Sequence, residues 1–226
     1  MPDPRESSAV TSGRGRKSHL ALKATQGDDD ARGTSAENRG RRSVPPRDRP
    51  LPHSRPAFPT EHSRIAFLEL VGSAAAKLGW QVAAYSVLTT HYHFLVLTPL
   101  PNLAEGMRLI QGRYAFRLNR ARGSRGPLWE GRYHSRSLQS STHVVRAAVY
   151  IDVNAFAAGM VDDPSAWPWC SYKANIGIAP GPGWHHPGVV HQHVGAFADE
   201  AARVYRELVE SRLEVLRAER GSDTSV

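Results

Sequence analysis

The sequence contains one cysteine and no long apolar run. A single thiol, Cys170, among 226 residues excludes an internal disulfide bond and suits a reducing compartment. No apolar stretch approaches the roughly 18 residues that a membrane-spanning helix needs. The basic residues near the N-terminus are not followed by the apolar core of a secretory signal. We therefore expect a soluble, cytoplasmic protein without a membrane partner.

Lysine and acidic side chains are scarce relative to arginine. Lysine and arginine together number 29, against 21 aspartates and glutamates, which gives a net charge of +8 and a pI of about 10.0. Most of the basic residues are arginines, whose planar guanidinium group can bind two phosphate oxygens at once. This balance favours a polyanionic partner without identifying it.

Aromatic residues are absent before Phe58. The segment 1–56 is rich in Ser, Gly, Pro, Arg and Asp, and such a segment buries too little apolar surface to offset its ordering entropy. We therefore expect a disordered, basic, proline-rich tail over 1–56. Its arginines leave open a non-specific contact with nucleic acid. A folded domain should cover 57–176, followed by a Gly/Pro-rich loop and a helix within 177–226.

The folded part alternates helical and strand-like patterns. Thr60 and Asn102 are expected to cap the first two helices, which should end at Gly79 and Gly123. The later helices are expected over 142–158 and 196–217. The expected strands are 81–88, 91–98 and 133–139, and the first two should form an antiparallel hairpin. This order predicts an α+β domain with helices on one face of an antiparallel sheet.

Two histidines separated by one bulky residue lie in the second of these strands. Side chains alternate between the two faces of a strand, so His91 and His93 should emerge together while Tyr92 points the other way. Two imidazoles on one face can chelate a divalent metal ion. By itself, the pattern is more often two polar residues on the wet side of a strand.

A tyrosine and an asparagine share one side of the helix predicted over 142–158. Tyr150 and Asn154 are four residues apart and therefore lie one helical turn from each other. The amide oxygen of Asn154 could complete a metal site begun by the histidines, and the phenol could reach a group bound there. Asp152 falls on the apolar side of the helix, where we expect an ion pair with an arginine.

These residue types together favour phosphodiester chemistry. A phenol is a weak nucleophile near neutral pH because its pKa is about 10, but a phosphate polarised by Mg²⁺ or Mn²⁺ is easier to attack. Two imidazoles and one amide leave coordination positions open for phosphate oxygen and water. A covalent phosphotyrosine would conserve the energy of the broken bond and permit rejoining.

Arginines dominate the chain between Asn102 and Arg146, where nine arginines face only two acidic residues. Such an excess favours contacts with phosphates over a merely solvated surface. Trp129 and Tyr133 could stack on unpaired bases or pack in the core. The candidate phosphate contacts are Arg108, Arg113, Arg117, Arg120 and Arg132.

A second group of histidines follows the Gly/Pro-rich loop. His191 and His193 repeat the spacing of the first pair, and His185 and His186 precede them. The residue between His191 and His193 is polar, and prolines and glycines surround the group. We therefore expect a solvated loop here and no second metal site.

Several motifs in a fixed order resemble the single-tyrosine HUH transposases, in particular the REP-associated tyrosine transposases and their insertion-sequence-200-like relatives. The resemblance covers roughly residues 58–215. It rests on His-Tyr-His in a strand, Gly-Arg-Tyr-Ala-Phe-Arg-Leu-Asn-Arg, Leu-Trp-Glu-Gly-Arg-Tyr, Tyr-Ile-Asp-Val-Asn, Ala-Gly-Met-Val and Trp-Pro-Trp-Cys-Ser-Tyr.

The resemblance implies a ferredoxin-like fold, usually a homodimer, that acts in the cytoplasm, at the nucleoid, on single-stranded DNA or DNA hairpins. It implies that His91 and His93 bind Mg²⁺ or Mn²⁺, with Asn154 in the position of the third ligand. It also implies that Tyr150 attacks the scissile phosphate during DNA transposition, which leaves a 5′-phosphotyrosine and a free 3′-hydroxyl.

Three departures from the family pattern keep other functions open. No apolar strand is evident before Asn38-Arg39-Gly40, so we expect the first strand of the sheet to be missing. The family's Met-Pro-Asn and Asn-Pro are replaced by residues 88–90 and by Asn154-Ala155. The chain could therefore be a catalytically inactive or domesticated DNA-hairpin-binding protein, or an adaptor that dimerises through the helix at 196–217.

Overall fold

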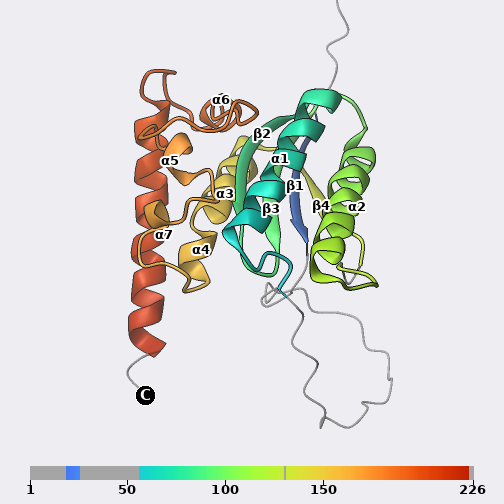
Figure 1. The fold of residues 1–226 in the computed structure, drawn as a ribbon. Coiled ribbons are helices and arrows are strands. Elements are labelled where there is room, and N and C mark those ends of the chain that lie inside the picture. Colours follow the sequence, from blue (N-terminus) through green and yellow to red (C-terminus); the bar gives the residue numbers. More distant parts are fainter. Residues whose placement is uncertain (1–18, 26–55, 130, 224–226) are drawn as a thin grey trace, which may run out of the picture.

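The computed structural model of the chain describes residues 19–25, 56–129 and 131–223, and its fold is α+β as expected (Figure 1). Strands and two long helices alternate first, and shorter helices then lead to a long C-terminal helix. The first six elements are β1 (His19–Thr25), α1 (Glu61–Leu78), β2 (Gln81–Val87), β3 (Tyr92–Thr98), α2 (Leu103–Arg122) and β4 (His134–Leu138). The elements that follow are α3 (Ser141–Asp152), α4 (Asn154–Ala157), the 3₁₀ turn η1 (Pro164–Ala166), α5 (Tyr172–Asn175), α6 (Gly188–His191) and α7 (Ala201–Asp223).

The four strands form one antiparallel sheet in the order β2-β3-β1-β4. With the element order βαββαβ, this is the ferredoxin-like arrangement, which confirms the expected fold class. The predicted hairpin is also confirmed, because β2 pairs with β3 and a short turn joins them. A shift in register between Val82 and Ala84 marks an irregularity in β2.

The first strand is present, so the expectations of a missing strand and of disorder throughout 1–56 are wrong for His19–Thr25. β1 pairs with β3 from His19↔Thr98 to Thr25↔Tyr92 and with β4 from Leu20↔Leu138 to Ala24↔His134. It therefore joins β4 to the hairpin. Its seven residues include the short apolar run Leu20-Ala21-Leu22, which stands between polar stretches of sequence and gives no clear strand pattern. The rest of the predicted tail, except Pro56, lies outside the described residues.

The predicted limits of α1 are confirmed. The Thr60 side chain accepts a hydrogen bond from the Ser63 backbone N–H at 3.2 Å, and the Ser63 hydroxyl accepts one from the Thr60 backbone N–H at 3.1 Å. Gly79 ends the helix with φ 67°, a left-handed conformation that glycine adopts without steric cost.

Asn102 precedes α2 as predicted, but its side chain does not cap the helix. Its amide oxygen accepts a hydrogen bond from the indole N–H of Trp80 at 2.8 Å, and its amide nitrogen donates to the Leu78 carbonyl at 3.1 Å. Asn102 therefore fastens the start of α2 to the end of α1. Gly123 ends α2 as expected, with φ 60°.

The first of two cores lies between α1, α2 and one face of the sheet. Aromatic rings dominate it: Phe58 and Phe67 have centroids 4.8 Å apart, and Phe67 and Tyr114 have centroids 5.0 Å apart. The Tyr114 hydroxyl donates to the Ala57 carbonyl at 2.6 Å, which ties α2 to the segment before α1. This core fixes the hairpin of β2 and β3 from one side.

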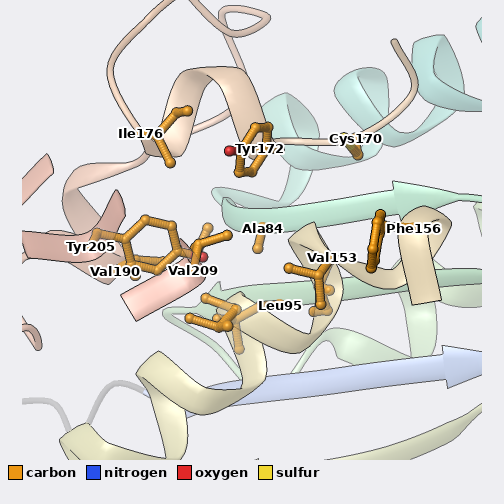
Figure 2. Close-up of a cluster of buried hydrophobic side chains, with 14 of the residues drawn as sticks. Ala84, Leu95, Val153, Phe156, Cys170, Tyr172, Ile176, Val190, Tyr205 and Val209 are labelled. Atoms are coloured by element: carbon orange, nitrogen blue, oxygen red, sulfur yellow. The ribbon is translucent and has the colours of Figure 1, made fainter. Parts of the chain in front are cut away.

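The second core covers the opposite face of the sheet (Figure 2). Leu95 of β3 packs there with residues of α3 and α4 and with Tyr205 and Val209 of α7. The expectation of helices on one face therefore holds for α1 and α2, while α3 to α7 cover the other face. Helix α7 begins at Ala201 and not at 196, and its buried stripe packs against its own domain.

Irregular segments close the outer edge of β2. The Val87 N–H donates to the Trp169 carbonyl at 2.9 Å, the Ser171 N–H to the Tyr85 carbonyl at 2.9 Å, and the His186 N–H to the Val82 carbonyl at 2.8 Å. These bonds satisfy backbone groups that an edge strand leaves open. Within the described part of the chain, no helix is both long and apolar enough to cross a membrane.

Candidate active site

His93 is the second residue of β3, and His91 lies immediately before the strand. The turn from β2 is closed by a hydrogen bond from the Leu88 N–H to the His91 carbonyl at 2.9 Å. The two imidazole rings lie with centroids 4.9 Å apart and planes at 86°. The strand pattern therefore correctly predicted that the two rings are neighbours.

His93 is buried on the face of the sheet that α3 covers, with 5% of its surface exposed. Neither ring nitrogen has a hydrogen-bond partner. Burial, followed by the proximity of His91, lowers the pKa of His93 to about 3, so its ring is neutral near pH 7. A neutral, buried imidazole with two unused nitrogens fits a ligand for a divalent cation.

His91 is partly buried, and burial lowers its pKa as well. Its Nδ1 atom lies 3.0 Å from the hydroxyl of Thr90. This hydrogen bond occupies one ring nitrogen and leaves Nε2 available for another partner. Thr90 thus orients His91 from the adjacent position in the chain.

Tyr150 lies against His93. Helix α3 begins after Ser140, whose hydroxyl accepts the His143 N–H at 3.3 Å, and Tyr150 lies near the C-terminal end of this helix. The phenol and the His93 imidazole have centroids 5.4 Å apart and planes at 82°. Tyr150 is 50% exposed, so part of its surface remains open to solvent although its ring contacts the histidine.

Asn154 follows one turn later, although the helix predicted over 142–158 is divided in two. Helix α3 ends at Asp152, and α4 begins at Asn154. Hydrogen bonds from the Val153 N–H to the Val149 carbonyl and from the Ala157 N–H to the Val153 carbonyl continue the helical path across the break. Asn154 is buried, and its amide oxygen has no hydrogen-bond partner. An orphaned buried amide oxygen fits a hard-metal ligand.

The candidate ligands are therefore two imidazoles and one amide. Within the described ranges, no group of three or more His, Cys, Asp and Glu side chains forms a metal site. Ser86, which the sequence did not point to, pairs with His93 across the hairpin. Its hydroxyl is fully buried and, like the His93 nitrogens, has no hydrogen-bond partner.

Asp152 does not form the ion pair that we expected. Its buried carboxylate accepts hydrogen bonds from the Ser171 hydroxyl, from the Asn175 amide at 2.9 Å and from the Tyr205 hydroxyl at 2.8 Å. Burial raises the pKa of Asp152 to about 6, and the three donors oppose that rise. Neutral donors replace an arginine because this position lies inside the second core, where α5 and α7 meet α3. The carboxylate anchors the helix that carries Tyr150.

Arg64 contacts the turn that precedes His91, and the sequence analysis did not identify it. Its guanidinium carbon lies 5.2 Å from the Trp167 ring centroid and 4.6 Å from that of Trp169. Its Nη2 atom donates to the Thr89 hydroxyl at 3.4 Å, in the turn before His91. These partners lie far apart in the sequence, so no local pattern could predict that Arg64 contacts Trp167, Trp169 and Thr89 together.

The expectation of a solvated loop is wrong for His185 and His191 of the second histidine group, whereas His186 is exposed as expected. His185 is buried, its Nε2 atom donates to the Ala83 carbonyl at 3.2 Å, and its ring lies 5.5 Å from the Tyr85 centroid. His191 donates from Nε2 to the Asn175 carbonyl at 2.7 Å. Residues 185–186 pair with the backbone of β2, which holds this segment against the sheet. His185 and His191 are therefore structural residues.

The predicted phosphate-binding arginines divide into separate groups. Arg113, Arg117 and Arg120 line one open depression on α2, and they make no ion pair with any described residue. Arg108 lies five residues before Arg113 and therefore about 140° around the helix from it. Arg132 is exposed in the loop before β4.

Trp129 packs against the first core, which was the alternative to base stacking. Its ring centroid lies 5.8 Å from that of Tyr92 and 6.0 Å from that of Tyr114. The indole N–H donates to the Gln111 carbonyl at 3.2 Å. Tyr133 is partly buried and packs against the same core.

A comparison with solved structures finds the same arrangement of elements in a REP-associated tyrosine transposase bound to a REP hairpin. The TM-score is 0.51, the sequence identity is 15%, and the match covers 80% of this chain and 89% of that chain. The two chains share a fold. No protein-family model and no curated protein matches the sequence. At this identity, the likeness concerns the fold alone.

Proposed function

We propose that the chain is a metal-dependent tyrosine transposase that cuts and rejoins single-stranded DNA, with Tyr150 as the nucleophile. The observation that carries this proposal is the contact between the Tyr150 phenol and the His93 imidazole, beside His91. The orphaned amide oxygen of Asn154, one turn from Tyr150, supports the same site.

The ligands in this site would be His91, His93 and Asn154. A bound Mg²⁺ or Mn²⁺ supplies positive charge to the non-bridging oxygens of a phosphodiester. The neutral state of His93, enforced by burial, keeps its nitrogen lone pair available near pH 7. The packing around Asp152 holds the helix that presents Tyr150, so the nucleophile and the ligands keep their relative positions.

In the proposed reaction, the phenol oxygen of Tyr150 attacks phosphorus and its proton leaves to solvent. The bond between phosphorus and the 3′ oxygen breaks, and that oxygen takes up a proton to become a free 3′-hydroxyl. The protein then carries a 5′-phosphotyrosine. A 3′-hydroxyl of another DNA end reverses these steps, which joins the strands and restores the phenol.

The proposed partner is single-stranded DNA or a DNA hairpin. The structural neighbour was solved with a REP hairpin, and the exposed arginines of α2 supply the charge that phosphates require. A homodimer in the cytoplasm, close to the nucleoid, is part of the same proposal.

Substitution of the nucleophile tests this function. Tyr150→Phe should abolish covalent attachment of DNA in the presence of Mn²⁺ while the variant still binds a hairpin oligonucleotide. Tyr172→Phe, a buried tyrosine of the second core, serves as the matched control and should still form the adduct. Adducts that persist in Tyr150→Phe would reject Tyr150 as the nucleophile.

A second candidate is a DNA-hairpin-binding protein of the same fold without catalysis. The exposed arginines and the candidate catalytic residues lie on different sides of the sheet, which supports this alternative. Arg113, Arg117 and Arg120 belong to α2. Tyr150 and His93 lie on the side that α3 covers. Binding could therefore survive the loss of cleavage. Wild-type protein that binds hairpins but forms no adduct would support this candidate.

A further inference from the structure

Phe116 is one of the most exposed aromatic residues in the described part of the chain, with 67% of its surface accessible. It lies on the outer side of α2, away from the first core, which buries Tyr114 and Leu118 of the same helix. Single exposed apolar residues are common on protein surfaces and need no explanation by themselves. The surroundings of Phe116 are what distinguish it.

Arg113, Arg117 and Arg120 lie beside Phe116 and line the same depression, together with Ala121. Residues three and four apart on a helix are neighbours on its surface, so Phe116 has Arg113 on one turn and Arg120 on the next. None of the three arginines forms an ion pair with a described residue. The surface thus combines an accessible ring with uncompensated positive charge.

A second exposed phenylalanine, Phe197, has acidic neighbours in place of arginines. Phe197 is 80% exposed, but the sequence beside it supplies Asp199 and Glu200. These carboxylates would repel the phosphates of a DNA strand. Phe197 therefore serves as a natural control for Phe116.

We propose that Phe116 is a stacking platform for an unpaired base of single-stranded DNA, with Arg113, Arg117 and Arg120 holding the phosphates beside that base. Stacking on an aromatic ring does not depend on base identity, since every base has a π face, and flanking cations follow the backbone. This inference rests on the proposed DNA function and extends it to α2, which lies on the opposite side of the sheet from α3 (Figure 1).

The chemistry of the depression favours a nucleic acid over a second copy of the chain. A protein surface that covered Phe116 would also bury three guanidinium groups, and each would need a carboxylate or several acceptors. A single strand offers an aromatic face and regularly spaced anions together.

The test measures binding of the full chain to a fluorescein-labelled 20-residue thymidine oligonucleotide and to an abasic strand with the same number of phosphates. Phe116→Ala should weaken binding to the thymidine strand by about 5- to 150-fold and leave the abasic strand unaffected. Phe116→Tyr should restore binding, Phe116→Leu should not, and Phe197→Ala should behave as wild type.

Salt dependence separates stacking from charge. Arg117→Gln should reduce the slope of log affinity against log salt concentration by about one, whereas Phe116→Ala should leave the slope unchanged. Equal affinity of Phe116→Ala and wild type for the thymidine strand would overturn the proposal. A loss of affinity that accompanies conversion of a dimer to a monomer would also overturn it, because the surface would then bind a second copy. Covalent adduct formation by wild type is measured separately, so its failure would reject the proposed reaction without bearing on Phe116.

Discussion

The imidazole of His93 lies edge-on to the phenol of Tyr150, with ring centroids 5.4 Å apart. One ring comes from β3 and the other from α3, and the second core packs these two elements together. The contact is therefore a property of the folded domain and does not depend on a loop. It places a phenol beside a neutral imidazole whose nitrogens have no hydrogen-bond partner.

Removal of a histidine ligand should weaken metal binding. His93→Ala deletes an imidazole whose nitrogens have no protein partner, and we expect affinity for Mn²⁺ to fall by about tenfold or more. Isothermal titration calorimetry with MnCl₂ and no DNA measures this directly. His62→Ala, an exposed histidine on α1, is the control. Equal affinities in the two variants would show that His93 is not a ligand.

The hydroxyl of Tyr205 should stabilise the fold through Asp152. Tyr205→Phe removes one of three donors to a buried carboxylate, and hydrogen bonds to charged groups contribute about 1.5–3 kcal/mol. The free energy of unfolding in urea should fall by about that amount. Tyr172→Phe removes a hydroxyl of the same core that does not bond to Asp152, so it should cost less. Equal losses would contradict the role assigned to the carboxylate.

Acid should destabilise the fold through His185. Burial lowers the pKa of His185 to about 4, from an ordinary value of about 6.5. Between these values the unfolded chain binds a proton that the folded chain excludes, so the free energy of unfolding falls as the pH drops. The full cost is on the order of 3 kcal/mol, reached below about pH 4.

Urea unfolding of His185→Gln from pH 7 to pH 4 measures this contribution. Glutamine can still donate to the Ala83 carbonyl but does not titrate, so the variant should lose less stability across the window than wild type. Comparison of the two proteins removes contributions that they share, including that of Asp152. The exposed neighbour His186→Gln should match wild type. Parallel pH profiles for all three proteins would exclude His185 as the source.

Two glycines of α2 should respond in opposite ways to alanine. A Cβ atom at Gly106 would overlap the Trp80 ring, and overpacking of this kind costs about 1–3 kcal/mol. A Cβ atom at Gly112 meets no atom within 4 Å, and alanine there should stabilise the helix by about 0.5–1 kcal/mol. Thermal unfolding of the two variants checks the signs. Destabilisation by both would mean that the exposed side of α2 is also constrained.

The parts of the fold that the sequence predicted well depend on local patterns. Alternation along the strand placed His91 and His93 side by side, and helical spacing placed Asn154 one turn from Tyr150. Thr60, Gly79 and Gly123 marked helix ends because capping involves only nearby backbone groups. Each of these inferences needed no knowledge of distant contacts.

The errors arose where distant partners decide the structure. β1 is short and lies within a polar segment, and its pairing with β3 and β4 is not visible in composition. Asp152 receives donors from residues 171, 175 and 205, which no helical pattern connects. His185 is buried because the segment that contains it pairs with the edge of β2 through backbone hydrogen bonds.

The proposed reaction is tested most directly by following both ends of a cleaved strand. Wild-type protein is incubated with Mn²⁺ and a pool of single-stranded oligonucleotides that carry a stable hairpin with randomised flanks, and the products are separated on a denaturing gel. A label at the 3′ end should migrate with the protein, because the 5′-phosphate of that fragment is bound to Tyr150. A label at the 5′ end should appear on a shorter free strand that a polymerase can extend. Absence of any adduct, or attachment of the 5′ label to the protein, would contradict the proposed reaction.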